Sequence, residues 1–282
     1  MPGTLFVVAT PIGNLEDITL RALRVLREVA VIAAEDTRRT AHLLARHAIS
    51  TPTTSLHEHN EHQKSPSLIE RLLRGDSIAL VSDAGTPTVS DPGAHLVQLA
   101  SEAGIRVEAI PGASAVMAAL SVSGLSTQTF TFLGFVPTRS KDRNAWFVRL
   151  LNSEGVVIFF EAPHRIRETM EELGSVAGDV TVLMARELTK THEELVRGHI
   201  SAVLDQLTDG RGEYTVVAII GRKPEIQPAE PPSAETLRRE LGEITDNKNA
   251  SRRTAVATLA KRHGLSPNDV YRALENAKKS GS

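Results

Sequence analysis

Three loops rich in small residues follow strand-like segments, and their composition suits close approach of the backbone to a bound molecule. They are Ala9–Asn14 (ATPIGN) after the stretch 5–9, Ser82–Gly93 (SDAGTPTVSDPG) after 78–81, and Ile110–Ala115 (IPGASA) after 106–110. Glycine lets the backbone approach a ligand, and loops at the carboxyl ends of parallel strands line the crevice of open α/β sheets. Each loop alone is compatible with an ordinary turn. Together they favour one shared small-molecule site.

Residue types and motifs that are missing exclude other chemistries. None of the three loops has the glycine fingerprint of dinucleotide-binding folds or a phosphate-binding loop with its lysine, which disfavours nucleoside triphosphates. The sequence contains no cysteine, so disulfides, thiolate zinc sites, iron–sulfur clusters and cysteine nucleophiles are excluded. The histidines of Leu56–His62 (LHEHNEH) lack an established ligand motif, and we expect no metal.

Two charged segments are further candidates for function. Glu35–Arg39 (EDTRR) follows the strand-like stretch 30–34, and its acidic pair suits a ribose hydroxyl, a positively charged methyl donor or an acceptor. The alternative is a solvated helix start capped by Asp36. The basic segment 137–143 contains Arg139, Lys141 and Arg143, with Trp146 and Phe147 close behind. That combination suits an RNA backbone with a stacked base, although Trp146 fits a core position equally well.

Strand-like and helix-like stretches alternate up to residue 221, which predicts an α/β protein with a largely parallel first sheet. A helix is expected over 19–29, and Ser65-Pro66 and Asp91-Pro92 have the pattern of helix starts. A boundary near 124–129 divides the chain into a lobe of residues 1–124 and a lobe of residues 125–222. The second lobe is expected to contain strands 130–135, 156–160, 180–185 and 215–221, with a helix over 165–173.

The C-terminal part has a different character. Residues 223–232 include four prolines and are typical of a linker. Residues 233–282 predict three helices (233–244, 250–263 and 267–279) with a helix-turn-helix-like pattern and a small core of Val256, Leu259, Val270 and Leu274. Residues 246–282 carry eight Lys or Arg against three acidic residues, whereas the whole chain has a net charge of −2. We therefore expect RNA phosphate contacts from Arg252, Arg253, Lys261 and Arg262, unless the tail is a dimerisation or docking element.

The motifs, in this order, resemble the bacterial small-subunit ribosomal RNA methyltransferase I family of the tetrapyrrole-methylase superfamily. The matching stretches are LFVVATPIGN (5–14), AEDTRR (34–39), HEHNE (57–61), VSDAGTPTVSDPG (81–93), IPGASA (110–115), FLGFVP (132–137), FEAPHR (160–165), ARELTKT (185–191) and EYT (213–215). They cover most of the chain up to residue 221. The tail is matched less well.

The resemblance implies two α/β lobes, the second with a mixed sheet, that hold S-adenosylmethionine in the cleft between them, usually in a homodimer. It places donor contacts at Pro11, Asp83, Ala84, Gly85, Thr86, Val89, Ser114, Ala115, Glu161 and Leu188. In the tetrapyrrole enzymes a glycine-glycine-aspartate-proline loop holds the donor. Here that loop reads Ala84-Gly85-Thr86-Pro87, so its aspartate is lost and Asp83 is a possible substitute.

The reaction implied by the resemblance is methylation of the ribose 2′-oxygen of a cytidine in the decoding region of 16S rRNA, within the small ribosomal subunit. Asp36, Arg38, His59 and Glu61 are candidates for activating the hydroxyl, and the residues alone do not select a base among them. A tetrapyrrole methyltransferase and a non-catalytic RNA-binding protein are the alternatives. With no basic leader and no apolar run long enough to span a bilayer, we expect a cytoplasmic protein without membrane contact.

Overall fold

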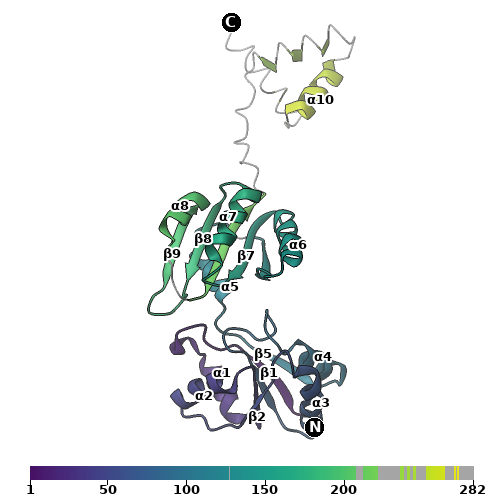
Figure 1. Cartoon of the computed structure of the whole chain (residues 1–282). Helices are drawn as coiled ribbons and strands as arrows, with labels where there is room; N and C mark the ends of the chain where they lie inside the picture. The colour runs from purple at the N-terminus through teal and green to yellow at the C-terminus, as the bar shows by residue number, and fades with distance from the viewer. Residues whose placement is uncertain are drawn as a thin grey trace. The chain divides into compact units, whose positions relative to one another are not determined.

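The structure is a computed structural model that describes residues 1–126, 128–207 and 212–221. In the C-terminal part it describes residues 236–237, 240–241, 244–245, 252–263, 270 and 272. The chain divides into a compact unit of Met1–Gly221 and a second unit of Arg222–Ser282 (Figure 1). Among the helices of the described residues, none has the length and apolar character needed to cross a membrane.

The first sheet is entirely parallel, as the alternating pattern predicts. Its strands are β1 (Thr4–Val8), β2 (Val31–Ala34), β3 (Thr53–Ser55), β4 (Ile78–Val81) and β5 (Arg106–Ile110), in the order β3-β2-β4-β1-β5. Every residue of β2 and β4 is buried, which explains why both strands are continuous apolar runs without alternation. Because the strands are parallel, all their carboxyl ends lie at one edge of the sheet.

Helices cover both faces of this sheet (Figure 1). Helices α1 (Leu20–Glu28) and α2 (Thr37–Arg46) pack on one face, and α3 (Glu61–Leu73) and α4 (Ala94–Glu102) pack on the other. A short 3-10 helix (Leu15–Asp17) precedes α1. The expected helix over 19–29 is confirmed to within a residue at each end, and its cap is Thr19, whose Oγ1 accepts a hydrogen bond from the Ala22 amide at 3.1 Å.

Both predicted proline-marked helix starts were wrong. Helix α3 begins at Glu61, one turn before Pro66, because a turn at 57–60 already supplies carbonyls to the amides of Glu61 and Lys64. Helix α4 begins after Gly93, which has a φ of 114° and provides no capping side chain. The amides at the start of α4 are bonded instead by a side chain from α3. A local turn has therefore replaced the expected cap of α3, and a long-range contact has replaced that of α4.

The second sheet is mixed, as expected. Its strands are β6 (Phe130–Phe135), β7 (Gly155–Glu161), β8 (Thr181–Arg186), β9 (Glu194–His199) and β10 (Tyr214–Ile220), in the order β6-β7-β10-β8-β9. Only β6 and β7 pair in parallel, and the other pairs are antiparallel. Helices α6 (Ser140–Leu151), α7 (Ile166–Ala177) and α8 (Ile200–Gln206) contribute to the large apolar core on one face of this sheet.

Helix α5 (Ala115–Ser123) covers the other face of the second sheet, although it directly follows the last strand of the first. Val116, Ala119 and Leu120 of α5 pack against residues of β7, β8 and β10, including Ile158, Leu183 and Val217. The start of this helix therefore stands at the junction of the two lobes. The lobe boundary near residue 124 stays a prediction, and by packing α5 belongs with the second sheet.

The described residues of the C-terminal unit include helix α10 (Arg252–His263) and a small apolar cluster. Leu237, Val256, Leu259, Ala260 and Val270 are buried in it, so three of the four expected core residues do pack together. The fourth, Leu274, lies outside the described residues, as do most of the expected helices 233–244 and 267–279. The side chains of Arg252, Arg253, Lys261 and Arg262 also lie outside them, so their RNA contacts stay a prediction.

Candidate functional site

Backbone contacts join the three small-residue loops at the carboxyl edge of the first sheet. The β1 loop (Ala9–Asn14) and the β4 loop (Ser82–Gly93) are bridged at Thr10 and Gly85, each amide donating to the other's carbonyl at 2.8 and 3.0 Å. The Ala9 amide donates to the carbonyl of Ile110 at 3.1 Å, where the β5 loop (Pro111–Ser114) begins. A Cβ on Gly112 would lie 3.1 Å from the Cβ of Ala9. The loops thus form one continuous surface.

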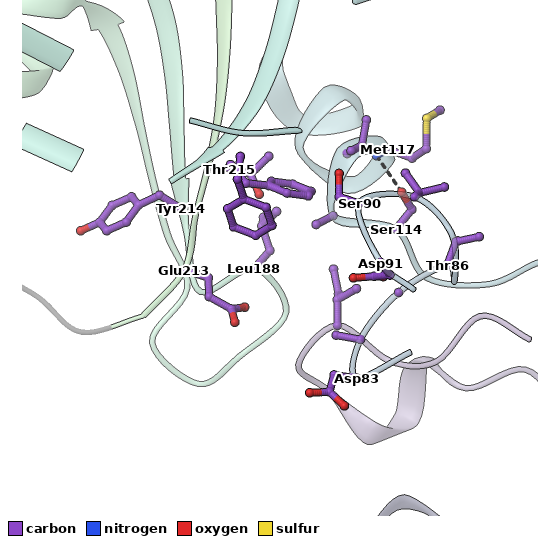
Figure 2. A pocket seen from close by; sticks show the side chains of 18 of the residues that line it. Asp83, Thr86, Ser90, Asp91, Ser114, Met117, Leu188, Glu213, Tyr214 and Thr215 are labelled. Carbon is purple, nitrogen blue, oxygen red and sulfur yellow. Dashed lines mark hydrogen bonds between the residues drawn. The ribbon is translucent and has the colours of Figure 1, made fainter. Parts of the chain in front are cut away.

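A pocket of about 580 Å³ lies between this surface and the second lobe (Figure 2). Of the ten residues that the resemblance implicates in ligand binding, nine line it: Asp83, Ala84, Gly85, Thr86, Val89, Ser114, Ala115, Glu161 and Leu188. Pro11 is not among the lining residues, but the next residue, Ile12, is. The pocket volume is in the range of small-molecule sites.

Other lining residues were not assigned to the site from the sequence. They include Glu35, Arg39, Ser90 and Asp91 in the first lobe and Phe130, Phe132, Phe135, Phe160, Glu187, Lys190, Glu213, Tyr214 and Thr215 in the second. Glu35 and Arg39 belong to the charged run EDTRR and Asp91 to the β4 loop, so the sequence carried a signal for these three. Residues of β6 and β10 lie in the family-matched stretches FLGFVP and EYT, but only the sheet order shows which strand ends face the pocket.

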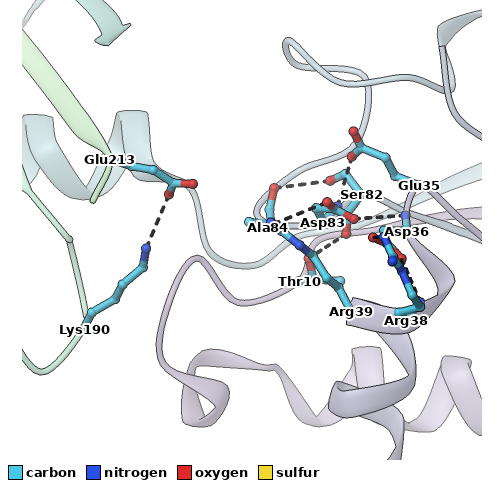
Figure 3. A network of polar contacts seen from close by, with 10 residues as sticks. All are labelled: Thr10, Glu35, Asp36, Arg38, Arg39, Ser82, Asp83, Ala84, Lys190 and Glu213. Atoms are coloured by element: carbon cyan, nitrogen blue, oxygen red, sulfur yellow. Dashed lines mark hydrogen bonds and ion pairs between the residues drawn. The ribbon is translucent and has the colours of Figure 1, made fainter. Parts of the chain in front are cut away.

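In the first lobe, the carboxylates of Glu35, just after β2, and Asp83, just after β4, each accept a hydrogen bond from the backbone of the other loop (Figure 3). The Asp83 amide donates to Glu35 Oε2 at 3.1 Å, and the Asp36 amide donates to Asp83 Oδ1 at 3.0 Å. Arg39 NH1 lies 3.4 Å from Asp83 Oδ2. This reciprocal arrangement fixes the two loops together and places the Glu35 and Asp83 side chains in the pocket lining.

Asp91 is the third carboxyl on this side of the pocket (Figure 2). The pKa of Asp91 is raised to about 6, mainly by burial and also by the nearby charges of Glu35 and Asp83, against an opposing hydrogen bond from Ser82. A carboxyl with such a pKa exchanges its proton near neutral pH. The three carboxyls together give this wall a negative potential that favours a cationic ligand.

A second group of charges lies on the other lobe (Figure 3). Lys190 Nζ is 2.8 Å from Glu187 Oε1 and 3.5 Å from Glu213 Oε2. The β1 loop meets this segment at Gly13, where a Cβ would lie 2.4 Å from Lys190 Cγ and 3.0 Å from the Leu188 carbonyl oxygen. Glycine is required there because any side chain would separate the loop from the second lobe.

The four residues proposed from the sequence to activate a hydroxyl do not appear among the lining residues in the described part of the chain. Asp36 is the N-cap of α2: its Oδ1 accepts from the Arg38 amide at 2.9 Å, and its Oδ2 lies 2.8 Å from Arg38 NH2. The Arg38 hydrogen bonds lower the pKa of Asp36 well below its usual range, which makes it a poor base. The cap interpretation is the one that the structure supports.

Glu61 and His59 have different surroundings. Glu61 is buried, and its Oε1 accepts hydrogen bonds from the amides of Gly93, His95 and Leu96 at 3.1, 2.7 and 3.4 Å. It therefore caps α4 and anchors the end of the β4 loop. His59 is exposed, with its ring centroid 6.0 Å from that of His57. No group of three or more potential ligands in the described residues is arranged to hold a metal ion.

The basic segment 137–143 extends into the start of α6, and its residues differ in exposure. The side chain of Arg143 is only 11% exposed, and its Nε and NH2 donate to Glu172 Oε2 at 2.7 Å and Thr169 Oγ1 at 3.0 Å. Buried partners thus hold its guanidinium, and its RNA contact stays a prediction. Trp146 is also buried and donates to the Leu133 carbonyl at 3.1 Å. Arg139 and Lys141 are exposed, and their RNA contacts stay a prediction.

Glu161 lines the pocket, but its carboxylate is engaged by the protein itself. Oε1 accepts from the Ala162 amide at 2.7 Å and lies 2.6 Å from Arg165 NH2, while Oε2 accepts from Thr169 Oγ1 at 2.6 Å. Such a satisfied buried carboxylate is expensive to disturb. Its role is to fix the end of β7 at the pocket wall.

The chain matches the tetrapyrrole (corrin/porphyrin) methylases over residues 4–204. Curated relatives named ribosomal RNA small subunit methyltransferase I match nearly its full length. The one from Synechocystis sp. is 43% identical and aligns with 95% of this chain and 96% of its own. The relative from Vibrio cholerae is 44% identical and aligns with 96% of this chain and 94% of its own. The one from Haemophilus influenzae is 40% identical and aligns with 96% of each chain.

Solved structures share the fold at low sequence identity. A diphthine synthase superposes with a TM-score of 0.61 at 18% identity, covering 77% of this chain and 89% of its own. A Thermus thermophilus uroporphyrin-III C-methyltransferase, complexed with S-adenyl homocysteine, superposes with a TM-score of 0.55 at 18% identity. The superposition covers 77% of this chain and 97% of that enzyme's own. From the sequence match and the curated relatives together, the chain belongs to the tetrapyrrole methylase family and, within it, to the ribosomal RNA small subunit methyltransferase I family.

Proposed function

We propose that this protein transfers a methyl group from S-adenosylmethionine to the ribose 2′-oxygen of a cytidine in the decoding region of 16S rRNA. Similarity over almost the whole chain to relatives named ribosomal RNA small subunit methyltransferase I carries the substrate class. The pocket between the lobes supports the use of a small-molecule donor. A substrate in the small ribosomal subunit places the reaction in the cytoplasm, and by the family resemblance the active form is a homodimer.

The pocket fits the proposed donor in shape and charge. Gly85 lines the pocket without a side chain, and Gly112 lets the β5 loop pack closely against Ala9 of the β1 loop. Glu35, Asp83 and Asp91 provide negative charge for a sulfonium, and apolar residues such as Leu188 and Val116 offer contacts for a purine ring. When bound, S-adenosylmethionine supplies a methyl group on a positively charged sulfur, and transfer of that group to a hydroxyl oxygen releases the hydroxyl proton.

We assign the acceptance of this proton to Asp91. It lines the pocket, as do Asp83 and Ser114 (Figure 2). Burial and its acidic neighbours bring its pKa to about 6, so that near neutral pH it is largely deprotonated yet still a better base than an ordinary aspartate. The Glu35 and Asp83 side chains orient this wall through their contacts with each other's backbone.

The function is tested with small ribosomal subunits that lack 2′-O-methylation in the decoding region. The protein is incubated with these subunits and methyl-labelled S-adenosylmethionine, and the product nucleotide is identified by nuclease digestion and mass spectrometry. We expect label on the 2′-oxygen of a single cytidine. Label on a base would correct the acceptor atom, and transfer to a porphyrinogen instead of RNA would replace the proposed substrate.

Gly85→Val is expected to weaken binding of S-adenosylhomocysteine more than tenfold in calorimetric titration. Gly85 lines the pocket with a φ of 76°, a region that β-branched residues avoid, and the new side chain would occupy ligand space. Gly104→Val is the matched control. Gly104 has a φ of 67° but lies in the turn after α4, with nothing within 4 Å of its Cβ position. Unchanged affinity in a folded Gly85→Val protein would place the site elsewhere.

Asp91→Asn is expected to lower kcat by about 10²- to 10⁴-fold while S-adenosylhomocysteine affinity changes little. The wild-type rate should rise with pH through about 6, as Asp91 loses its proton, and the variant should lack that inflection. A raised pKa also means that ionising Asp91 destabilises the folded wild-type protein as pH rises from about 4 to about 6. The variant has no carboxyl to ionise, so the difference in free energy of unfolding, variant minus wild type, should be larger at pH 8 than at pH 4. Asp36→Asn, which keeps its helix cap, is the control. An unchanged pH profile in Asp91→Asn would remove Asp91 as the base.

We further propose that the basic tail contributes RNA affinity without taking part in the chemistry. Charge reversal at Arg252 and Arg253 should reduce the slope of log affinity against log salt by at least about 1.4, because two phosphate contacts are lost. Donor affinity should stay the same. Arg24→Glu, on the exposed surface of α1, is a control for net charge. If the double variant binds small subunits with the wild-type slope, the tail serves dimerisation or docking instead.

A further inference from the structure

Four of the seven phenylalanines of the chain line the pocket. Phe130, Phe132 and Phe135 come from β6, and Phe160 comes from the neighbouring strand β7. The Phe160 ring centroid lies 5.0 Å from that of Phe132 and 5.2 Å from that of Phe135, with interplanar angles of 64° and 59°. These rings form an aromatic wall in the second lobe, defined as Phe132, Phe135 and Phe160, while the carboxyls of the pocket's acidic wall belong to the first.

A break in β6 aims Phe135 at the pocket. In a regular strand, residues three apart point to opposite faces, so Phe132 and Phe135 would be separated by the sheet. The pairing of β6 with β7 shifts register between these two residues, and Gly134 between them has a φ of 68°. Leu133 and Val136, also three apart, accordingly both point into the core on the other face. A bulge of this kind commonly redirects a side chain next to a functional site.

The redirected ring is left open to solvent. Phe135 is 56% exposed and Phe130 is 42% exposed. The bulge also touches the β4 loop, since a Cβ on Gly134 would lie 3.3 Å from Ser90 Oγ. The bulge therefore lies against the loop that carries Gly85 and Asp91, and Phe135 lines the same pocket as these two residues.

The proposed methyl transfer requires the acceptor nucleotide to lie near Phe135. For methyl transfer, the acceptor oxygen has to come within about 3–3.5 Å of the reacting carbon, so the acceptor ribose enters the pocket. Its nucleobase is attached to the carbon next to the one that carries the 2′-oxygen and must enter the pocket or its mouth with it. Proteins hold such unstacked bases on aromatic side chains, and the acidic wall has none to offer.

We propose that Phe135, supported by Phe132 and Phe160, is the stacking platform for the base of the nucleotide that is methylated. This inference rests on the proposed function. The ligand that stacks on Phe135 is a planar nucleobase. Two molecules carry one: the RNA acceptor, and the donor through its adenine. The acceptor is favoured because Phe135 presents the most exposed ring of the wall, where an incoming RNA reaches it first.

The first experiment compares Phe135→Leu with Phe135→Tyr. Leucine keeps an apolar side chain without a π-face, and tyrosine keeps the ring. We expect Phe135→Leu to lower kcat/KM for small subunits by about 5- to 100-fold and to change S-adenosylhomocysteine affinity less than twofold, while Phe135→Tyr stays near wild type. Loss of S-adenosylhomocysteine affinity instead would assign the ring to the donor. A change in sedimentation behaviour of Phe135→Leu would show a subunit interface, and either result overturns the proposal.

The second experiment does not depend on activity. Phe135→Trp introduces an exposed indole, and the only native tryptophan, Trp146, is buried. Stacking of a base should quench the new fluorescence when a single-stranded oligoribonucleotide with the decoding-region cytidine is added in the presence of S-adenosylhomocysteine. An oligonucleotide with an abasic site at that cytidine should quench much less. Equal quenching by the intact and the abasic oligonucleotide, or no quenching by either, overturns the stacking platform even if the enzyme is active. Quenching by the intact oligonucleotide without methylation of small subunits would overturn only the proposed function.

Discussion

Two backbone hydrogen bonds between Thr10 and Gly85 join the ends of β1 and β4, and the geometry of the pocket depends on this join. Both strands are central in the first sheet, so the loops that leave them start side by side. The bridge keeps them together after the sheet has ended. Because Gly85 has a positive φ, the β4 loop turns away from the bridge at once and runs along the pocket. Ala84, Thr86 and Val89 then reach the lining.

Side chains from distant parts of the sequence hold the rest of that loop. Glu35 and Asp83 exchange hydrogen bonds with the backbone of each other's loop near its start, and Glu61 bonds the amides that follow it. A loop fixed at both ends pays less conformational entropy when a ligand orders it. The β4 loop also tolerates unusual backbone conformations, since Thr88 and Ser90 both have a positive φ. Strained residues that the surroundings hold in place are common at binding sites.

The second lobe contributes a wall of different chemistry. Glu35, Asp83 and Asp91 face the pocket from the first lobe. The second lobe adds the aromatic rings, Glu161, and Lys190 with its partners Glu187 and Glu213. Helix α5 links the two, because its first residues line the pocket while the rest of its length packs on the second sheet. Under the proposed function, a donor with a positive sulfur and an acceptor with a flat base would find complementary surfaces on opposite sides of one cavity. Methyl transfer needs both ligands oriented together, which this division of labour favours.

The sequence by itself determined the α/β alternation, the parallel first sheet and the small-residue loops of the pocket, whereas β3, β9, α6 and α8 were not predicted. These features depend on apolar runs and on residues such as Gly85 and Ser114, whose preferences act over a few neighbouring positions. Only the tertiary structure decided the partners of the charged residues. Glu61 meets His95, 34 residues away, and Arg143 meets Glu172, 29 residues away, so neither interaction leaves a local signal. The direction of Phe135 also depended on a bulge, because one extra residue in a strand reverses which face its side chains occupy.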